Sequence, residues 1–416
     1  MSRAANPRNI AIIGGGPVGL EAALYARALG HRAVVHERGE VADAVRRWGF
    51  VEMFSPWSLN VSPLGLEALR RSGRRLPPGG GFPTGRELRE LYLLPIARSL
   101  GGSIEERSEV AGVARSGLLK GEEIGTPART ARPFRLLLRR DGREDEARAD
   151  CVIDASGVYG QPCRLGDGGV AAPGEERAAD RIDRHLPDVR GRDRRLFEGR
   201  RVLLAGGGYS AATALLDLLE LARTSNAAEL TWIWRRPCER PLPVFEGDPL
   251  PARDRLARAA NEVAASPPRG CRALPGTVVE RVEPRDDADG GPLRVAVRRE
   301  DGGRETIEVD RILSLVGYRP DAEIHRELQV HLCYASEGPM KLAAALLGSS
   351  GGGDCLAPRS LGPETLASPE PGFFVIGHKS YGRRSDFLLR HGKEQVRDVF
   401  RLIEGDPRLD LYAERS

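Results

Sequence analysis

The sequence contains no long apolar run and no closely spaced pair of cysteines. No stretch approaches the roughly 18 consecutive apolar residues of a transmembrane helix, so we expect a chain that does not span a membrane. The six cysteines show no C-x-x-C spacing, which argues against a zinc pattern and against a dense disulfide framework. We therefore predict a reduced, cytoplasmic protein without a metal site. The cysteines are Cys151, Cys163, Cys238, Cys271, Cys333 and Cys355.

An excess of one charge is also missing. Basic and acidic residues nearly balance, at a formal net charge of +4, which is too weak to argue for a nucleic-acid partner. The first nine residues are too short and polar for a signal peptide, so we expect none. At 416 residues, the chain is long enough for two or three domains.

A glycine-rich turn follows the first apolar segment. Residues 9–13 are typical of a buried parallel strand, and residues 20–29 are typical of a helix. Between them, Gly14, Gly16 and Gly19 match the pattern G-x-G-x-x-G. In this pattern the first glycine permits a tight turn, the second lets the backbone approach a pyrophosphate, and the third lets helix and strand pack closely. The helix N-terminus adds free N–H groups, so the segment predicts a dinucleotide site.

An acidic residue ends the second strand of this unit. Glu37 follows the mainly apolar segment 33–36, at a position where a carboxylate can accept hydrogen bonds from ribose hydroxyl groups. A carboxylate also repels a 2′-phosphate, so this site suits FAD or NAD rather than NADP. Pro17 and Arg38 complete the predicted contacts of this first site.

A second unit of the same kind lies near the middle of the chain. Residues 201–205 are typical of a strand, the next six residues match G-x-G-x-x-A, and the helix is expected to reach residue 221. This unit also predicts a bound nucleotide. Its predicted contacts are Gly206, Gly208, Ser210 and Ala211.

Two arginines take the place of the acid in the second unit. Arg235 and Arg236 follow the expected strand at residues 229–234. Arginine binds phosphate through paired N–H donors, which favours NADPH over NADH. The alternative is that both arginines only solvate a loop. Two nucleotide units in one chain indicate electron transfer from a nicotinamide to a flavin, which assigns FAD to the first unit and NADPH to the second.

The order of these motifs resembles that of the two-dinucleotide-binding-domain flavoproteins, which include thioredoxin reductase, the flavin-containing monooxygenases and the N-hydroxylating monooxygenases. Three further segments carry the resemblance. Val152–Gly157 is similar to the family's D-A-T-G segment, and Ile312–Pro320 is similar to its A-T-G-Y-R-P segment. Gly372–His378 stands where the family has a strand ending in G-D beside the flavin.

The resemblance implies an α/β fold with two Rossmann-like (βαβ) nucleotide-binding domains. Residues 1–165 and 305–416 would form a discontinuous FAD-binding domain, and residues 195–304 an inserted NAD(P)H-binding domain. Residues 171–197 would connect them. The resemblance also implies FAD contacts from Val110, Gly157, Gly377 and His378.

The cysteine pairs that relay electrons in the reductases of this superfamily are missing. Cys238 and Cys271 of the second unit lie far apart in sequence, and residues 46–57, after the first unit, contain no cysteine. The F-x-G-x-x-x-H signature of the flavin-containing monooxygenases is also not recognisable. His378 stands where many relatives have aspartate, and it either hydrogen-bonds beside the flavin or only starts the next loop.

Four residues are candidates for catalysis because relatives bring the corresponding loops to the flavin. Trp48 can stack on the flavin or serve as a core aromatic. Arg47 can receive an anionic substrate or lie on the surface. Lys379 and Tyr381 can contact flavin or substrate, or belong to a solvated loop before an amphipathic helix.

The residues leave several functions open. The leading hypothesis is a monooxygenase that uses NADPH, FAD and O2 on a small-molecule substrate, which needs a dry pocket rather than many catalytic side chains. The second is a reductase or dehydrogenase that passes electrons to a small molecule, a thiol or a protein carrier. The third is a protein whose bound nucleotide serves structure or sensing. Cys333 and Cys355 are either a redox pair or buried inert thiols. Many relatives form homodimers, and the sequence leaves that state open too.

Overall fold

The computed structural model describes residues 6–74, 80–224, 229–284, 291–348 and 361–413. The chain divides into two compact units. Unit 1 comprises Met1–Gln161 and Arg319–Ser416, and unit 2 comprises Pro162–Tyr318. Among the described residues, no helix is both long enough and apolar enough to cross a bilayer.

Unit 1 is built on a five-stranded parallel sheet. Its strands lie in the order β16-β7-β1-β2-β3, and every pairing between neighbours is parallel. The central strands are almost wholly buried and apolar, as expected for a sheet covered on both faces. The strands are β1 (Asn9–Ile13), β2 (Arg32–His36), β3 (Ile104–Glu105), β7 (Cys151–Asp154) and β16 (Phe373–Val375).

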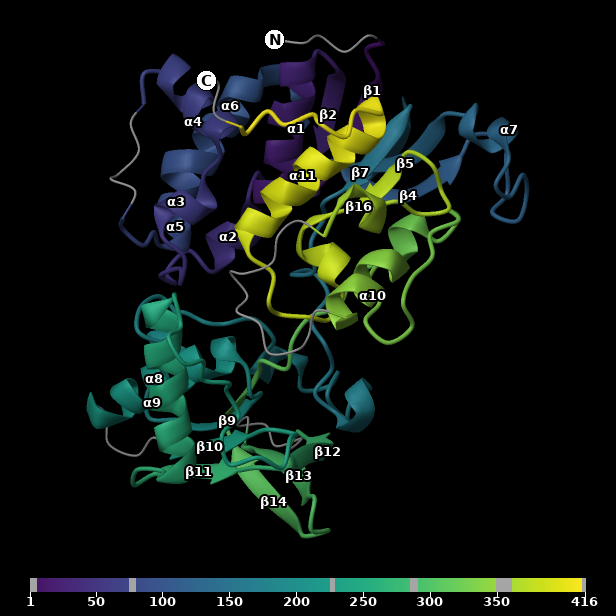
Figure 1. Ribbon diagram of the computed structural model, residues 1–416. Helices are drawn as coiled ribbons and strands as arrows, with labels where there is room; N and C mark the ends of the chain where they lie inside the picture. Colours follow the sequence, from purple (N-terminus) through teal and green to yellow (C-terminus); the bar gives the residue numbers. More distant parts are fainter. Residues whose placement is uncertain (1–5, 75–79, 225–228, 285–290, 349–360, 414–416) are drawn as a thin grey trace. The chain divides into compact units, whose positions relative to one another are not determined.

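Two layers cover this sheet. On one face, α1 (Pro17–Leu29) lies beside α11 (Leu389–Glu404) (Figure 1). Between these helices, Tyr25 stacks on Phe400 at 4.9 Å between ring centroids. On the other face lies an antiparallel three-stranded sheet. Its strands are β4 (Glu109–Arg115), β5 (Phe134–Arg140) and β6 (Arg143–Ala149).

Shorter helices complete unit 1. Among them, α5 begins with a capping box, in which Thr84 and Glu87 bond each other's backbone N–H groups. The short helices are α2 (Asp43–Arg47), α3 (Trp57–Asn60), α4 (Pro63–Arg71), α5 (Gly85–Leu88), α6 (Leu94–Leu100), α7 (Pro127–Thr130), α10 (Met340–Gly348) and the 3₁₀ turns η6 (Glu323–His325) and η8 (Gly377–Tyr381).

Unit 2 repeats the arrangement. Its parallel sheet has the order β11-β10-β9-β15-β8. The helices α8 (Tyr209–Thr224) and α9 (Pro251–Ala265) pack against one face of this sheet, and an antiparallel sheet packs against the other. The parallel strands are β8 (Ile182–Asp183), β9 (Arg201–Ala205), β10 (Glu229–Ile233), β11 (Cys271–Leu274) and β15 (Arg311–Ser314). The antiparallel strands are β12 (Thr277–Glu283), β13 (Leu293–Arg299) and β14 (Arg304–Val309).

The predicted fold class is therefore confirmed: the chain has two Rossmann-like units, and the second is inserted into the first. The unit boundaries lie at other residues than the expected 165, 195 and 305. Residues 305–318 stay in unit 2 because β14 pairs with β13 and β15 pairs with β9. The expected connection contributes β8, which pairs with β15.

Candidate nucleotide-binding sites

The glycine turn of unit 1 is tightly packed at its ends and open in its middle. Gly14 has a φ of +100°, and a Cβ there would lie 2.8 Å from the carbonyl oxygen of Ala155. A Cβ on Gly19 would lie 1.9 Å from the carbonyl oxygen of Gly14. A Cβ on Gly16 would meet nothing within 4 Å, and α1 begins with Pro17 directly after it. The turn thus presents Gly16 and a helix N-terminus to free space.

Glu37 lies against this turn. Its Oε2 accepts a hydrogen bond from the N–H of Gly15 at 2.7 Å, and its Oε1 accepts one from Gly39 at 2.8 Å. Each carboxylate oxygen keeps a further lone pair, so the group is fixed in place and can still accept from a ligand hydroxyl.

Val110 and Arg38, two further residues predicted to contact FAD, lie near Glu37. The N–H of Ser108 donates to the carbonyl oxygen of Glu37 at 2.8 Å, which places the start of β4 and the buried Val110 beside the turn. Arg38 is exposed, and its Nη2 lies 2.9 Å from where a Cβ on Gly160 would stand. Arg38 therefore reaches toward the chain segment that follows β7.

Three segments meet at the carboxyl edge of the sheet in unit 1. Asp154, at the end of β7, is in register with Ile13, the residue before the glycine turn. Val375 of β16 is in register with Asp154. Beyond these strands, Gly157 and Gly377 both have a φ of +71°, and a Cβ on Gly377 would contact Val18 of α1. The structure thus brings the predicted contacts Gly157 and Gly377 to the edge that holds Gly16.

A fully buried ion pair joins two of these segments. The Nζ of Lys379 lies 2.6 Å from Oδ2 of Asp154 and donates to Oγ of Ser156 at 3.1 Å. Nδ1 of His325 lies 3.6 Å from the same Asp154 oxygen. Burial alone would raise the pKa of Asp154, but the Lys379 ammonium group and His325 hold it well below its usual range. Asp154 is therefore an anion held by cationic and hydrogen-bonding partners.

His378 and Tyr381 lie in an aromatic cluster after β16. Nε2 of His378 lies 2.9 Å from the carbonyl oxygen of Arg384, and the ring stacks on Phe387 at 5.7 Å. Burial lowers the pKa of His378. A neutral imidazole that donates from Nε2 leaves Nδ1 as an acceptor. Tyr381 stacks on His391, and burial raises the pKa of its hydroxyl group above the usual range.

The other two candidates follow the glycine turn. Ala42, just before α2, donates its N–H to the carbonyl oxygen of Gly15 at 3.0 Å. Arg47, in α2, is ion-paired with Asp43 at 2.8 Å. Trp48 packs over Gly85, where a Cβ would lie 2.6 Å from the indole ring. Trp48 is therefore half-buried against the core, and a contact with a ligand stays a prediction.

The glycine turn of unit 2 has the same pattern of packing. Gly206 has a φ of +137°, and a Cβ there would lie 2.3 Å from the carbonyl oxygen of Leu315. The indole N–H of the buried Trp232 donates to the carbonyl oxygen of Gly206 at 2.7 Å, which fixes the turn. A Cβ on Gly208 would meet nothing within 4 Å, and α8, which contains Ser210 and Ala211, begins with the next residue.

Exposed arginines follow β10 beside this turn. A Cβ on Gly207 would lie 3.3 Å from the Cβ of Trp234, the residue before Arg235. Arg235 and Arg236 are exposed and make no ion pair with any residue that the structure describes. Their guanidinium groups are therefore available to an anion next to the glycine turn.

Known structures share this architecture at low sequence identity. The bacillithiol disulfide reductase of Bacillus cereus matches with a TM-score of 0.67 and 18% identity, over 96% of this chain and 99% of that one. The thioredoxin reductase of Lactococcus lactis matches at 0.58 and 18%, over 95% and 99%. The chain has the fold of the two-dinucleotide-binding-domain flavoproteins. An ornithine N-hydroxylase of Kutzneria sp. 744, whose structure holds reduced FAD, NADP⁺ and L-ornithine, also matches this flavoprotein fold, at 0.63 and 16%, over 95% and 99%. No family model matches the sequence.

The residues present fit the two nucleotides that this flavoprotein fold suggests. In unit 1, no atom lies within 4 Å of where a Cβ on Gly16 would stand, and the carboxylate of Glu37 keeps lone pairs of the kind that accept from a ribose hydroxyl group. In unit 2, the same holds for a Cβ on Gly208, and Arg235 and Arg236 take the place of the acid. The two sites therefore differ in charge at the position that distinguishes a nucleotide with a free ribose 2′-hydroxyl group from one with a 2′-phosphate.

Sequence reasoning placed Asp154 and Ser156 in the D-A-T-G-like segment but assigned them no role, and it assigned none to His325. Each partner of the ion pair is noticeable alone, because Asp154 ends the apolar segment Cys151–Asp154 and Lys379 is one of few lysines in an arginine-rich chain, but their pairing is not evident from the sequence. No comparable signal marked His325, which reaches the site only through folding. Cys355 lies outside the described residues, so its relation to Cys333 stays a prediction.

Proposed function

We propose that this chain is a FAD-dependent oxidoreductase that uses NADPH, and that it is a monooxygenase of a small molecule. The observation that carries the proposal is the pair of glycine turns, each open at its second glycine. One turn is bonded to Glu37, and the other lies beside Arg235 and Arg236. Bound FAD supplies hydride acceptance from the nicotinamide and, once reduced, reactivity toward O2.

The residues of each unit have distinct tasks in this proposal. The N-terminus of α1 and the open side of Gly16 bind the FAD pyrophosphate, and Glu37 accepts hydrogen bonds from the ribose. His378 is neutral, and its Nδ1 can accept a hydrogen bond. It therefore orients a hydroxyl group of FAD at the carboxyl edge of the parallel sheet in unit 1. In unit 2, Gly208 admits the NADPH pyrophosphate, and the arginines bind the 2′-phosphate.

The side chains at the carboxyl edge support an oxygenase. Lys379 is held by Asp154, His378 is neutral, and burial keeps the Tyr381 hydroxyl group protonated. These groups are suited to binding and to excluding water rather than to acid–base steps. Among the described residues the cysteines are free thiols, and their spacing in the sequence does not match the dithiol of the reductases.

One observation favours the alternative, a reductase of a disulfide or another acceptor. Hydrogen bonds from Ser336 and from the backbone of Ala335 lower the pKa of the Cys333 thiol. The turn that holds Cys333 lies against the segment after β16, because the N–H of Arg383 donates to the carbonyl oxygen of Ser336 at 2.9 Å. A thiol of lowered pKa beside the segment after β16, which the proposed FAD site uses, is suited to disulfide exchange.

Oxygen dependence separates the two functions. We expect steady-state NADPH oxidation by the FAD-loaded protein to stop under anaerobic conditions once the bound FAD is reduced. The aerobic rate of NADPH oxidation should be the same in Cys333→Ser as in wild type. Rapid anaerobic oxidation of NADPH with a disulfide substrate, lost in Cys333→Ser, would instead establish the reductase. Purified protein is assayed by NADPH absorbance with an oxygen electrode in parallel.

Matched substitutions test the two glycine turns. Gly16→Leu is expected to weaken FAD binding about a hundredfold, or by roughly 3 kcal/mol, because the side chain fills the space of the pyrophosphate. The apoprotein should keep its stability, since a Cβ at Gly16 touches nothing. Gly208→Leu is the matched control, and it should retain FAD and lose NADPH affinity. Fluorescence titration with each nucleotide measures both, and equal FAD binding by wild type and Gly16→Leu would disprove the site.

A further inference from the structure

The ion pair between Asp154 and Lys379 links two chain segments that the proposed FAD site uses. Asp154 ends β7 three residues before Gly157, and Lys379 follows Gly377 after the neighbouring strand β16. Their charged atoms lie 2.6 Å apart, with relative side-chain exposures of 0% and 1%. The pair therefore holds the two segments together beyond the point where the strands stop pairing.

Ser156 extends this link toward Gly157. Its hydroxyl group donates to Oδ1 of Asp154 at 2.6 Å and accepts from Lys379 at 3.1 Å, while its backbone N–H donates to the same carboxylate oxygen at 3.1 Å. Each of the three residues is thus bonded to the other two. Removing one partner therefore breaks side-chain hydrogen bonds that constrain the segment before Gly157.

A second contact holds the other segment on α11. Gln395 accepts from the N–H of Gly377 at 2.7 Å and donates to the hydroxyl group of Ser380 at 2.8 Å. Lys379 therefore projects from a turn that is bonded on both sides. Its ammonium group has a defined position, as a group that acts on a neighbouring site must have.

The pair also carries charge into the buried interior of unit 1. Two opposite charges at this distance nearly cancel at a third point, but either one alone would act strongly there because the local dielectric is low. A lone positive charge stabilises reduced, anionic flavin and raises its midpoint potential. A lone negative charge does the opposite.

We propose that Asp154 and Lys379 are positioning residues of the FAD site, which hold its two loops together and set the flavin potential by their balance of charge. This inference rests on the proposed binding of FAD by unit 1. A purely structural pair would stabilise the fold and leave the potential of the flavin unchanged.

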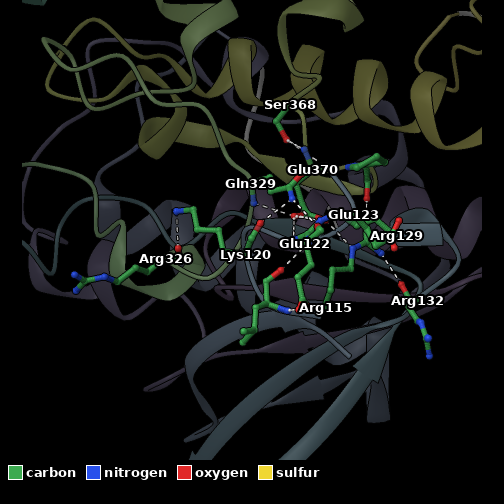
Figure 2. A network of polar contacts seen from close by, with 12 residues as sticks. Arg115, Lys120, Glu122, Glu123, Arg129, Arg132, Arg326, Gln329, Ser368 and Glu370 are labelled. Carbon is green, nitrogen blue, oxygen red and sulfur yellow. Dashed lines mark hydrogen bonds and ion pairs between the residues drawn. The ribbon is translucent and has the colours of Figure 1, made fainter. Parts of the chain in front are cut away.

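A second buried cluster in unit 1 provides the control. The carboxylate of Glu370 bonds Arg115 and Arg129, at 2.7 Å to the nearest nitrogen of each, and all three side chains are almost completely buried (Figure 2). Glu370 lies before β16, whereas Lys379 lies after it. Glu370→Gln therefore disturbs a comparable network at the opposite end of the same strand.

The experiment measures the midpoint potential of bound FAD and its dissociation constant at pH 9, well above the ordinary pKa of histidine and of carboxyl groups. We expect Lys379→Met to lower the potential and Asp154→Asn to raise it, with the double variant close to wild type. Each single variant should bind FAD about tenfold more weakly, as expected when a charge-assisted hydrogen bond is lost. Glu370→Gln should leave the potential unchanged.

Lys379→Arg keeps the charge and alters the geometry, so it should weaken FAD binding while the potential stays that of wild type. If one single variant does not fold, the potential of the other still decides the matter, because a purely structural pair would leave it unchanged. An unchanged potential in a single variant, shifts of the same sign in the two single variants, a shift in Lys379→Arg as large as that in Lys379→Met, or an equal shift in Glu370→Gln would overturn the inference. Wild-type protein that binds no FAD would instead overturn the proposed function.

Discussion

Replacement of Arg235 and Arg236 by alanine is expected to raise the KM for NADPH about a hundredfold and to leave the KM for NADH unchanged. A charge-assisted hydrogen bond is worth roughly 1.5–3 kcal/mol, and the lower value applies to each of these exposed guanidinium groups. The two together contribute about 3 kcal/mol, or about a hundredfold, because a tenfold change corresponds to about 1.4 kcal/mol. Both side chains are exposed beside the glycine turn, so their removal leaves no buried group unpaired. Steady-state kinetics with each nucleotide measures the effect.

Arg223→Ala is the matched control for this variant. Arg223 is also an exposed arginine of unit 2, but it lies in the last turn of α8 and pairs with Glu220. Its removal should change neither KM. An equal rise in the KM for NADPH and NADH in the double variant would mean that the arginines do not read the 2′-phosphate.

Glu370→Gln is expected to lower the free energy of unfolding by roughly 3–5 kcal/mol. The introduced amide would keep the shape of the side chain but leave two buried guanidinium groups without their anion. The backbone N–H of Gln329, which donates to Glu370 at 2.9 Å, would also lose a charged acceptor. Urea unfolding of wild type and variant measures the difference. Glu67→Gln, which breaks a surface pair with Arg71, should cost less than about 1 kcal/mol, and equal losses would contradict the assignment.

The stabilisation by Glu370 should depend on pH. Burial would raise the pKa of Glu370, but hydrogen bonds from Arg129, Gln329 and Arg115 hold it below its ordinary value. A carboxyl group with a lowered pKa in the folded state stabilises the fold above its unfolded pKa, near 4.3, and loses that effect as the pH falls. The difference between wild type and Glu370→Gln should be full at pH 7 and should shrink below about pH 4.

The local features were predictable because each lies within a short stretch of sequence. The strand, turn and helix around Gly16 occupy residues 9–29, so the packing that requires glycine can be inferred from the spacing alone. The same holds for Gly206 and for the arginines after β10. The position of Glu37 was predictable because it ends the second strand of the same βαβ unit.

The buried ion clusters were not predictable in this way. Asp154 and Lys379 lie 225 positions apart, and Arg115 and Glu370 lie 255 apart. Their proximity depends on strand order in the sheet, which places the late strand β16 beside β7. Nothing in the spacing of a single sequence identifies which distant charges will pair.

The boundary of the inserted unit depends on strand pairing as well. The expected domain boundary at residue 305 differs from that of the structure, because β15 hydrogen-bonds β9 and completes the sheet of unit 2. The chain crosses back only at Arg319, whose N–H bonds the carbonyl oxygen of Gln161 at 3.0 Å.

Anaerobic titration of the FAD-loaded protein with NADPH tests the central claim most directly. We predict that one equivalent of NADPH bleaches the visible flavin absorbance and that NADH does so only at much higher concentration. Absorbance that neither nucleotide changes, or a protein that takes up no FAD on reconstitution, would contradict the account.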